Sequence, residues 1–70
     1  MNQTIRIVVN GFPETVPENA TVADLLEHFQ EGDKDLIVER NGRFVFAQTY
    51  ASTTVAEGDR LEFINPDFGG

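Results

Sequence analysis

The sequence predicts an α+β fold in which a mixed five-stranded sheet packs on one helix. Three observations lead to this prediction. Segments of alternating apolar and polar residues lie near both ends of the chain, as in strands with one buried face. A single stretch between them has apolar residues at helical spacing, and two Asn-Gly dipeptides mark tight turns. With 70 residues, the chain is sized for one domain.

The N-terminal segment is expected to form a hairpin. Residues 4–9 alternate in polarity, which predicts a strand. Asn10-Gly11 follows, a dipeptide suited to the positive φ angles of a two-residue turn. A short strand should return through residues 14–16, and Pro13 and Pro17 confine it to the sheet edge because proline cannot donate to a ladder.

The helix is expected to begin after Thr21. Thr21 and Asp24 have the spacing of a capping box, in which each side chain accepts a hydrogen bond from the other residue's backbone N–H. We interpret His28, which lies off the apolar stripe, as an exposed surface histidine, and Gly32 as the C-terminal stop. The stripe itself is Val22, Leu25, Leu26 and Phe29.

A second hairpin is predicted around Asn41-Gly42, between strands at residues 36–40 and 43–46. A two-residue loop would place Val38 opposite Val45 and Ile37 opposite Phe46. It would also place Arg40 beside Arg43, which is unfavourable unless Glu39 or solvent relieves the pair.

The remaining segment leads to the last strand. Residues 47–55 are irregular, with Tyr50 and Val55 as expected anchors to the core, and residues 57–59 form a turn. Residues 60–64 alternate as a strand that Pro66 ends. A helix between two hairpins lets the first and last strands lie parallel at the sheet centre, which is the β-grasp (ubiquitin-like) arrangement. The predicted core is Ile5, Ile7, Val9, Val22, Leu25, Leu26, Phe29, Leu61 and Phe63.

Composition narrows the possible functions. The net charge of −7 disfavours binding to nucleic acid. The absence of cysteine excludes a disulfide, a thiol nucleophile and a thiolate metal site, and it favours a cytoplasmic protein. Residues 1–9 contain Arg6 and alternate in polarity, so neither a signal peptide nor a membrane span is expected there. One histidine and no clustered catalytic pair argue against an enzyme, and no cofactor or metal is expected.

The chain ends in Gly69-Gly70, and residues 66–70 are expected to form a flexible tail after a domain of residues 1–65. Glycine lacks a Cβ atom, so such a tail is thin enough to enter a narrow partner cleft that encloses the last carboxylate. Phe68 stands just before the glycines and is expected to help dock the partner, since aromatic residues often anchor interfaces.

Five segments of the chain, taken together and in order, match the pattern of a known family. They are Val9-Asn10-Gly11, residues 20–26, Val38-Glu39-Arg40-Asn41-Gly42, residues 57–63 and Gly69-Gly70. With these segments the chain resembles ThiS, a family of ubiquitin-like sulfur carriers of thiamine biosynthesis. The resemblance covers nearly the whole sequence in the family's order and spacing. Two segments depart from the family pattern, at residues 46–50 and 66–68.

The resemblance implies a chemistry at Gly70. A ThiF-like adenylating enzyme would use ATP to activate the C-terminal carboxylate, a persulfide donor would supply sulfur, and a ThiG-like thiazole synthase would receive it. Gly69 and Phe68 would serve recognition of the tail. The free protein is expected to be a monomer without a cofactor of its own.

Other accounts share these features. A MoaD-like subunit, or a carrier for cysteine or tRNA modification, has the same fold and the same Gly-Gly end. A ubiquitin-like protein modifier and a β-grasp interaction module with an incidental Gly-Gly belong to different functional classes. The chain length and the Val-Glu-Arg-Asn-Gly segment favour ThiS.

Overall fold

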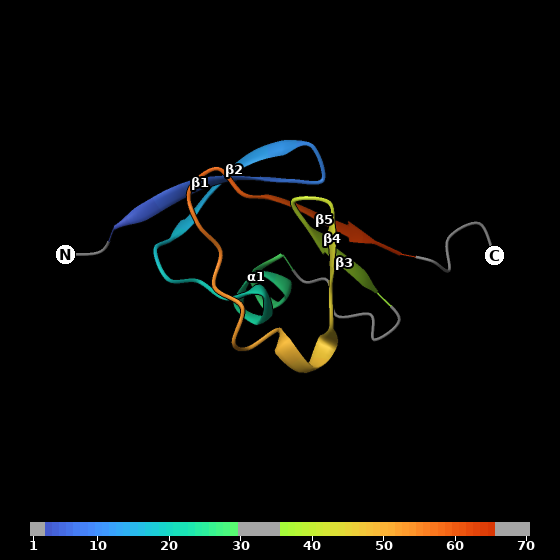
Figure 1. Cartoon of the computed structure of the whole chain (residues 1–70). Helices are drawn as coiled ribbons and strands as arrows, with labels where there is room; N and C mark the ends of the chain where they lie inside the picture. The colour runs from blue at the N-terminus through green and yellow to red at the C-terminus, as the bar shows by residue number, and fades with distance from the viewer. Residues whose placement is uncertain (1–2, 30–35, 66–70) are drawn as a thin grey trace.

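The computed structural model describes residues 3–29 and 36–65. Within these ranges one helix lies against one face of a five-stranded mixed sheet, whose strand order is β2-β1-β5-β3-β4 (Figure 1). The elements are β1 (Thr4–Val9), β2 (Phe12–Pro17), α1 (Val22–His28), β3 (Ile37–Arg40), β4 (Arg43–Val45), the 3₁₀ helix η1 (Ala47–Thr49) and β5 (Arg60–Ile64).

The first hairpin is confirmed, with β1 at the predicted residues. Asn10 and Gly11 have φ angles of 52° and 86°, as the two-residue turn requires. β2 is longer than predicted because it includes both Pro13 and Pro17. It lies at an edge of the described sheet and pairs with β1, so neither proline interrupts an interior ladder.

The capping box of α1 is confirmed by two reciprocal hydrogen bonds. The backbone N–H of Asp24 donates to Thr21 Oγ1 at 3.1 Å, and that of Thr21 donates to Asp24 Oδ2 at 2.9 Å. Val22 and Leu25 are fully buried, whereas Leu26 and Phe29 are half-buried at the edge of the core. The helix ends at His28 with Phe29 as its C-cap, and the predicted stop, Gly32, lies outside the described residues.

The second hairpin is confirmed in its turn and only partly in its register. Val38 lies opposite Val45 and Arg40 opposite Arg43, as predicted. The predicted pair of Ile37 with Phe46 is wrong, because β4 ends at Val45 and Phe46 already caps η1. Ile37 instead faces Ile64 of β5 on the other side of β3.

β5 occupies the centre of the described sheet and confirms the β-grasp topology. It runs parallel to β1, with Val9 beside Leu61, and antiparallel to β3, with Val38 beside Phe63. Its burial alternates, so that Leu61 and Phe63 face the core while Arg60 and Glu62 are exposed on the opposite face.

Most of the predicted core is buried. Ile5, Leu26 and Phe29 are exceptions, since they pack against the core while remaining partly exposed. The predicted anchors behave as expected, because Val55 is buried and Tyr50 is partly buried against the same cluster. The prediction missed four further members of the core, namely Val16, Ala20, Val38 and Val45. No helix within the described ranges is long and apolar enough to cross a membrane.

Candidate functional site

The described part of the candidate site is β5, the strand that precedes the predicted tail. Phe68, Gly69 and Gly70, the predicted site residues, lie outside the described residues. β5 carries the chain toward them from the middle of the sheet, and it ends at Ile64. The position of Asn65, the last described residue, therefore depends on the contacts that hold β5.

Asn10, in the β1–β2 turn, fixes β5 from one side. Its backbone N–H donates to the carbonyl of Leu61 at 2.9 Å, and its side-chain Oδ1 accepts from the N–H of Phe63 at 2.8 Å. β1 turns away after Val9, so the Asn10 side chain continues the parallel pairing by one more bond. One residue thus supplies both the positive φ of the turn and an acceptor for the neighbouring strand.

Asn41, in the β3–β4 turn, does the same from the other side. Its N–H donates to the carbonyl of Arg60 at 2.7 Å, and its Oδ1 accepts from the N–H of Arg60 at 2.9 Å. Its φ angle of 54° matches that of Asn10. The two Asn-Gly turns therefore hold β5 between them.

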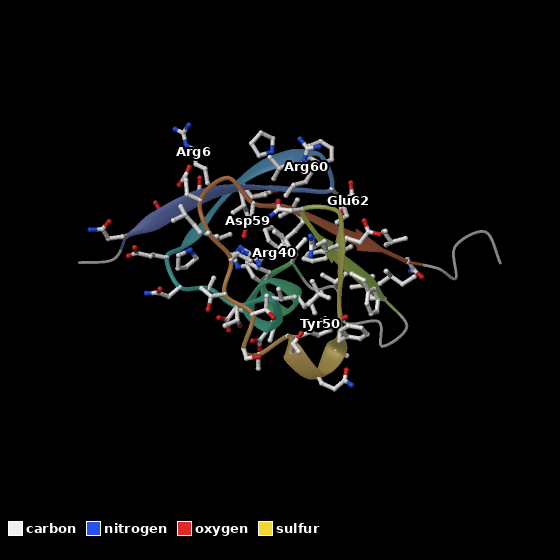
Figure 2. The ribbon with its side chains drawn as sticks, viewed as in Figure 1. Arg6, Arg40, Tyr50, Asp59, Arg60 and Glu62 are labelled. Carbon is white, nitrogen blue, oxygen red and sulfur yellow. The ribbon has the colours of Figure 1, made fainter. Side chains whose placement is uncertain are left out.

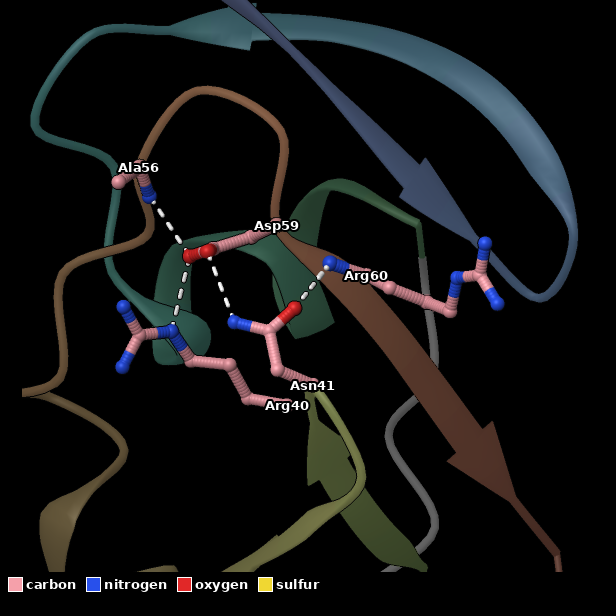
Figure 3. Close-up of polar contacts among 5 residues, drawn as sticks. All are labelled: Arg40, Asn41, Ala56, Asp59 and Arg60. Atoms are coloured by element: carbon pink, nitrogen blue, oxygen red, sulfur yellow. Dashed lines mark hydrogen bonds and ion pairs between the residues drawn. The ribbon is translucent and has the colours of Figure 1, made fainter.

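Asp59, the residue directly before β5, is a buried carboxylate with 7% of its surface exposed. Figure 3 shows its polar contacts. Its Oδ2 accepts from Arg40 Nε at 2.8 Å and from the N–H of Ala56 at 2.8 Å. Its Oδ1 accepts from Asn41 Nδ2 at 3.0 Å. The carboxylate thus joins the turn before β5 to the end of β3 and to the β3–β4 turn.

The protonation of Asp59 follows from these contacts. Burial alone would raise the pKa of this carboxyl. Hydrogen bonds from Asn41, Arg40 and Ala56, together with the charge of Arg40, outweigh burial and hold the pKa of Asp59 below its ordinary value. Asp59 is therefore ionised at neutral pH. Its bonds connect the turn before β5 to β3 and to the β3–β4 turn.

Asp59 also offsets the repulsion between Arg40 and Arg43, which lie opposite each other in the second hairpin. The prediction named Glu39 or solvent as the relief for Arg40 beside Arg43, whereas the ion pair of Arg40 is with Asp59 at 2.8 Å. Sequence reasoning missed this cluster, although its members lie in two of the segments that carry the family resemblance. Those segments are Val38-Glu39-Arg40-Asn41-Gly42 and residues 57–63.

Two exposed aromatic residues lie in β4 and directly after it. Phe44 is 54% exposed and Phe46 is 59% exposed, and their rings meet edge to face with centroids 4.8 Å apart. Phe44 lies opposite Glu39, and Glu39 opposite Glu62, so these side chains share the face turned away from α1. Ile37 and Ile64 belong to the same face by register. We call Ile37, Phe44, Phe46 and Ile64 the outer apolar surface.

The described residues include no cluster of candidate metal ligands. Within residues 3–29 and 36–65, His, Asp and Glu do not gather in groups of three or more that suit a metal ion. His28 is exposed, as predicted, and its ring packs edge to face on Phe29 at 4.7 Å.

Comparison with known proteins places these features in a family. The ThiS family model matches residues 2–70. Among solved structures, the chain is similar to the crystal structure of a thiamine biosynthesis protein (ThiS) from Geobacter metallireducens, with 33% sequence identity and a TM-score of 0.82. The alignment covers 94% of this chain and 100% of that protein. No curated protein sequence matches the chain significantly.

Proposed function

Because the chain belongs to the ThiS family, as its match over residues 2–70 shows, we propose that it is a sulfur carrier protein of thiamine biosynthesis. In this proposal Gly70 is adenylated and then carries sulfur as a C-terminal thiocarboxylate. The observation that carries the proposal is that the family match extends to Gly69-Gly70. The likeness to a thiamine biosynthesis protein at 33% identity supports the same pathway.

The carboxylate of Gly70 needs activation before it can accept sulfur. A C-terminal carboxyl has a reference pKa of about 3.5, so it is ionised at neutral pH and is a poor electrophile. Attack of a carboxylate oxygen on the α-phosphorus of ATP releases pyrophosphate and leaves an acyl-adenylate. A ThiF-like partner enzyme would bind the ATP and catalyse this step.

Sulfur then replaces AMP. The terminal sulfur of a persulfide attacks the carbonyl carbon, AMP leaves, and an acyl disulfide joins Gly70 to the donor. A thiol reductant cleaves that S–S bond, so the thiocarboxylate stays on Gly70 and the donor and reductant are left as a disulfide. A ThiG-like thiazole synthase would consume the thiocarboxylate. The carrier itself supplies no catalytic group, so it is a substrate of its partners in the cytoplasm and not an enzyme.

The domain contributes reach and a surface for recognition. β5 is held by Asn10 and Asn41, which supports a fixed starting point for a tail that enters a partner's active site. In our proposal Phe68 and the outer apolar surface dock the adenylating enzyme while Gly69 passes through a narrow channel. Exposed aromatic rings of this kind are typical anchors of protein interfaces.

The adenylation step can be tested by exchange of labelled pyrophosphate into ATP. The adenylating enzyme is incubated with ATP, Mg²⁺ and either the intact chain or a chain that lacks Gly70. We expect exchange that depends on the intact chain. Equal exchange with both chains would contradict activation at Gly70.

A further inference from the structure

Arg43 is a cation without a partner in the described part of the chain. It is exposed on β4, and its register places it opposite Arg40. Of these two arginines, Arg40 forms an ion pair within residues 3–29 and 36–65, and its partner is Asp59. Arg43, Arg40 and Asp59 together carry one net positive charge, in a chain whose net charge is −7.

Arg40 also retains donors for a ligand. Its bond to Asp59 uses Nε, and the structure shows no described residue bonded to its two terminal nitrogens. The side chain of Arg40 remains 35% exposed. Two neighbouring guanidinium groups with open donors are suited to a carboxylate or a phosphate.

The two arginines line a hollow of about 230 Å³ together with Phe44, Phe46, Thr49 and Thr53. The threonine hydroxyls already donate to backbone carbonyls, from Thr49 to Phe46 at 2.8 Å and from Thr53 to Thr49 at 2.7 Å. Among the side chains that line the hollow, hydrogen-bond donation is therefore left to the arginines. The exposed rings of Phe44 and Phe46 offer an apolar contact beside this cationic site.

The position of β4 favours an extended protein segment as the occupant. β4 lies at an edge of the described sheet, and within that sheet it pairs with β3. The opposite edge strand, β2, contains Pro13 and Pro17, which cannot donate to an added strand, whereas β4 contains no proline. A small free anion would use neither the edge nor the aromatic pair.

We propose that Arg43 and the terminal nitrogens of Arg40 bind a carboxylate of the adenylating partner. The carboxylate lies on a segment that follows the β4 edge and packs an apolar side chain on Phe44 and Phe46. This inference rests on the proposed function for the identity of the partner. Because most of the chain's charged side chains are acidic, an acidic segment is repelled elsewhere and accepted here, which fixes the orientation of the complex.

The test measures binding of the adenylating enzyme by titration calorimetry. Arg43→Gln should weaken binding about tenfold, and Arg43→Lys should recover part of the loss because it restores charge without the planar fork. The matched control is Arg6→Gln, which removes the same charge from β1. Arg6 points away from α1 (Figure 2), and β5 and β3 separate its strand from β4. Arg6→Gln should leave binding within about twofold of the parent, as expected for an exposed charge outside the contact.

Thermal unfolding separates this role from a structural one. Arg43→Gln should leave the melting temperature unchanged or slightly higher, since it removes the repulsion between Arg43 and Arg40. Equal binding losses for Arg43→Gln and Arg6→Gln would show that only the net charge of the chain matters, and this would overturn the proposal. Unchanged binding of Arg43→Gln would overturn it as well. Arg43-dependent binding of inorganic phosphate to the free carrier, in competition with the enzyme, would also overturn it in favour of a small-anion site.

The failure of this inference can be told from failure of the proposed function. Mass analysis of the sulfurated carrier is run on the same preparations. Sulfur on Gly70 with binding insensitive to Arg43 would overturn the inference and keep the carrier function. Arg43-dependent binding without any sulfur on Gly70 would keep the inference about the docking site and overturn the carrier function.

Discussion

The side-chain oxygen of Asn10 accepts a hydrogen bond from the backbone N–H of Phe63 at 2.8 Å, across 53 positions of sequence. The bond joins the first turn of the chain to the last strand. Asn41 makes the equivalent attachment to Arg60 from the second hairpin. Both turns therefore need asparagine for two reasons, a positive φ angle and an acceptor aimed at β5.

The substitution Asn10→Gly distinguishes the contribution of the side-chain acceptor from that of the positive φ angle. Glycine keeps the positive φ angle but leaves the Phe63 N–H without its acceptor, so we expect a loss of about 1–3 kcal/mol in the free energy of unfolding. Urea denaturation measures this loss. The control is Asn19→Gly, where φ is 72° and the residue is exposed, and its effect should stay within about 0.5 kcal/mol. Equal effects at both positions would show that the bond to Phe63 contributes nothing.

Sequence patterns predicted the fold because its strands and turns carry local signals. The alternation in residues 4–9 and 60–64, the capping box of Thr21 and Asp24, and the two Asn-Gly turns each depend on neighbours along the chain. Parallel pairing of the first and last strands followed from placing one helix between two hairpins.

What the sequence did not predict depends on contacts between distant segments. Val38 and Val45 each follow another apolar residue, Ile37 and Phe44, so the pattern along the chain does not show which of the two faces the core. Val16 lies in a strand with two prolines and no clear alternation, and its burial follows from its pairing with Ile5 of β1. Asp59 has the local appearance of a turn residue, and its burial becomes evident only when Arg40 and Asn41 are brought beside it. For the candidate site, the tail was predicted from its glycines, whereas the Arg40–Arg43–Asp59 arrangement required the register of β3 and β4.

Asp59 should make stability depend on pH. Its pKa is lower in the folded state than the reference value of about 3.9 in the unfolded chain. Its contribution is therefore fully present above that unfolded value and is lost as the pH falls through the lower folded pKa. Asp59→Asn should cost stability at neutral pH, by about 1–3 kcal/mol for the disrupted bonds to Arg40, Asn41 and Ala56.

The measurement for Asp59 compares the two proteins across pH. The difference in unfolding free energy between the parent and Asp59→Asn should shrink as the pH is lowered from about 7 to about 3 and below, where the parent's carboxyl becomes protonated. A difference that stays constant over this range would show that the charge of Asp59 does not stabilise the fold.

Leu25 and Leu26 should differ in their contribution to the core, although both belong to the predicted stripe. Leu25 is 1% exposed, and Leu26 is only partly buried. Leu25→Ala should cost about 2–5 kcal/mol, the usual range for a buried leucine, and Leu26→Ala should cost clearly less. Denaturant unfolding of the two variants checks this order, and a greater loss from Leu26→Ala would be inconsistent with the observed packing.

Phe68 is expected to anchor the adenylating enzyme. Phe68→Ala should weaken binding by more than about 1 kcal/mol, as truncation of an interface aromatic commonly does. Phe12→Ala is the matched control, because Phe12 is 69% exposed on the edge strand farthest from β4. Titration calorimetry with both variants measures the contrast. Binding that survives Phe68→Ala unchanged would remove this residue from the docking surface.

The most direct test of the carrier function is the intact mass of the protein after incubation with ATP, the adenylating enzyme, a persulfide donor and a thiol reductant. We predict a gain equal to the replacement of one oxygen by sulfur, localised to Gly70 by fragmentation. A chain extended by one residue beyond Gly70 should show no gain and should unfold at the same temperature as the parent. Sulfur on the untrimmed extended chain, or at any residue other than Gly70, would contradict the account.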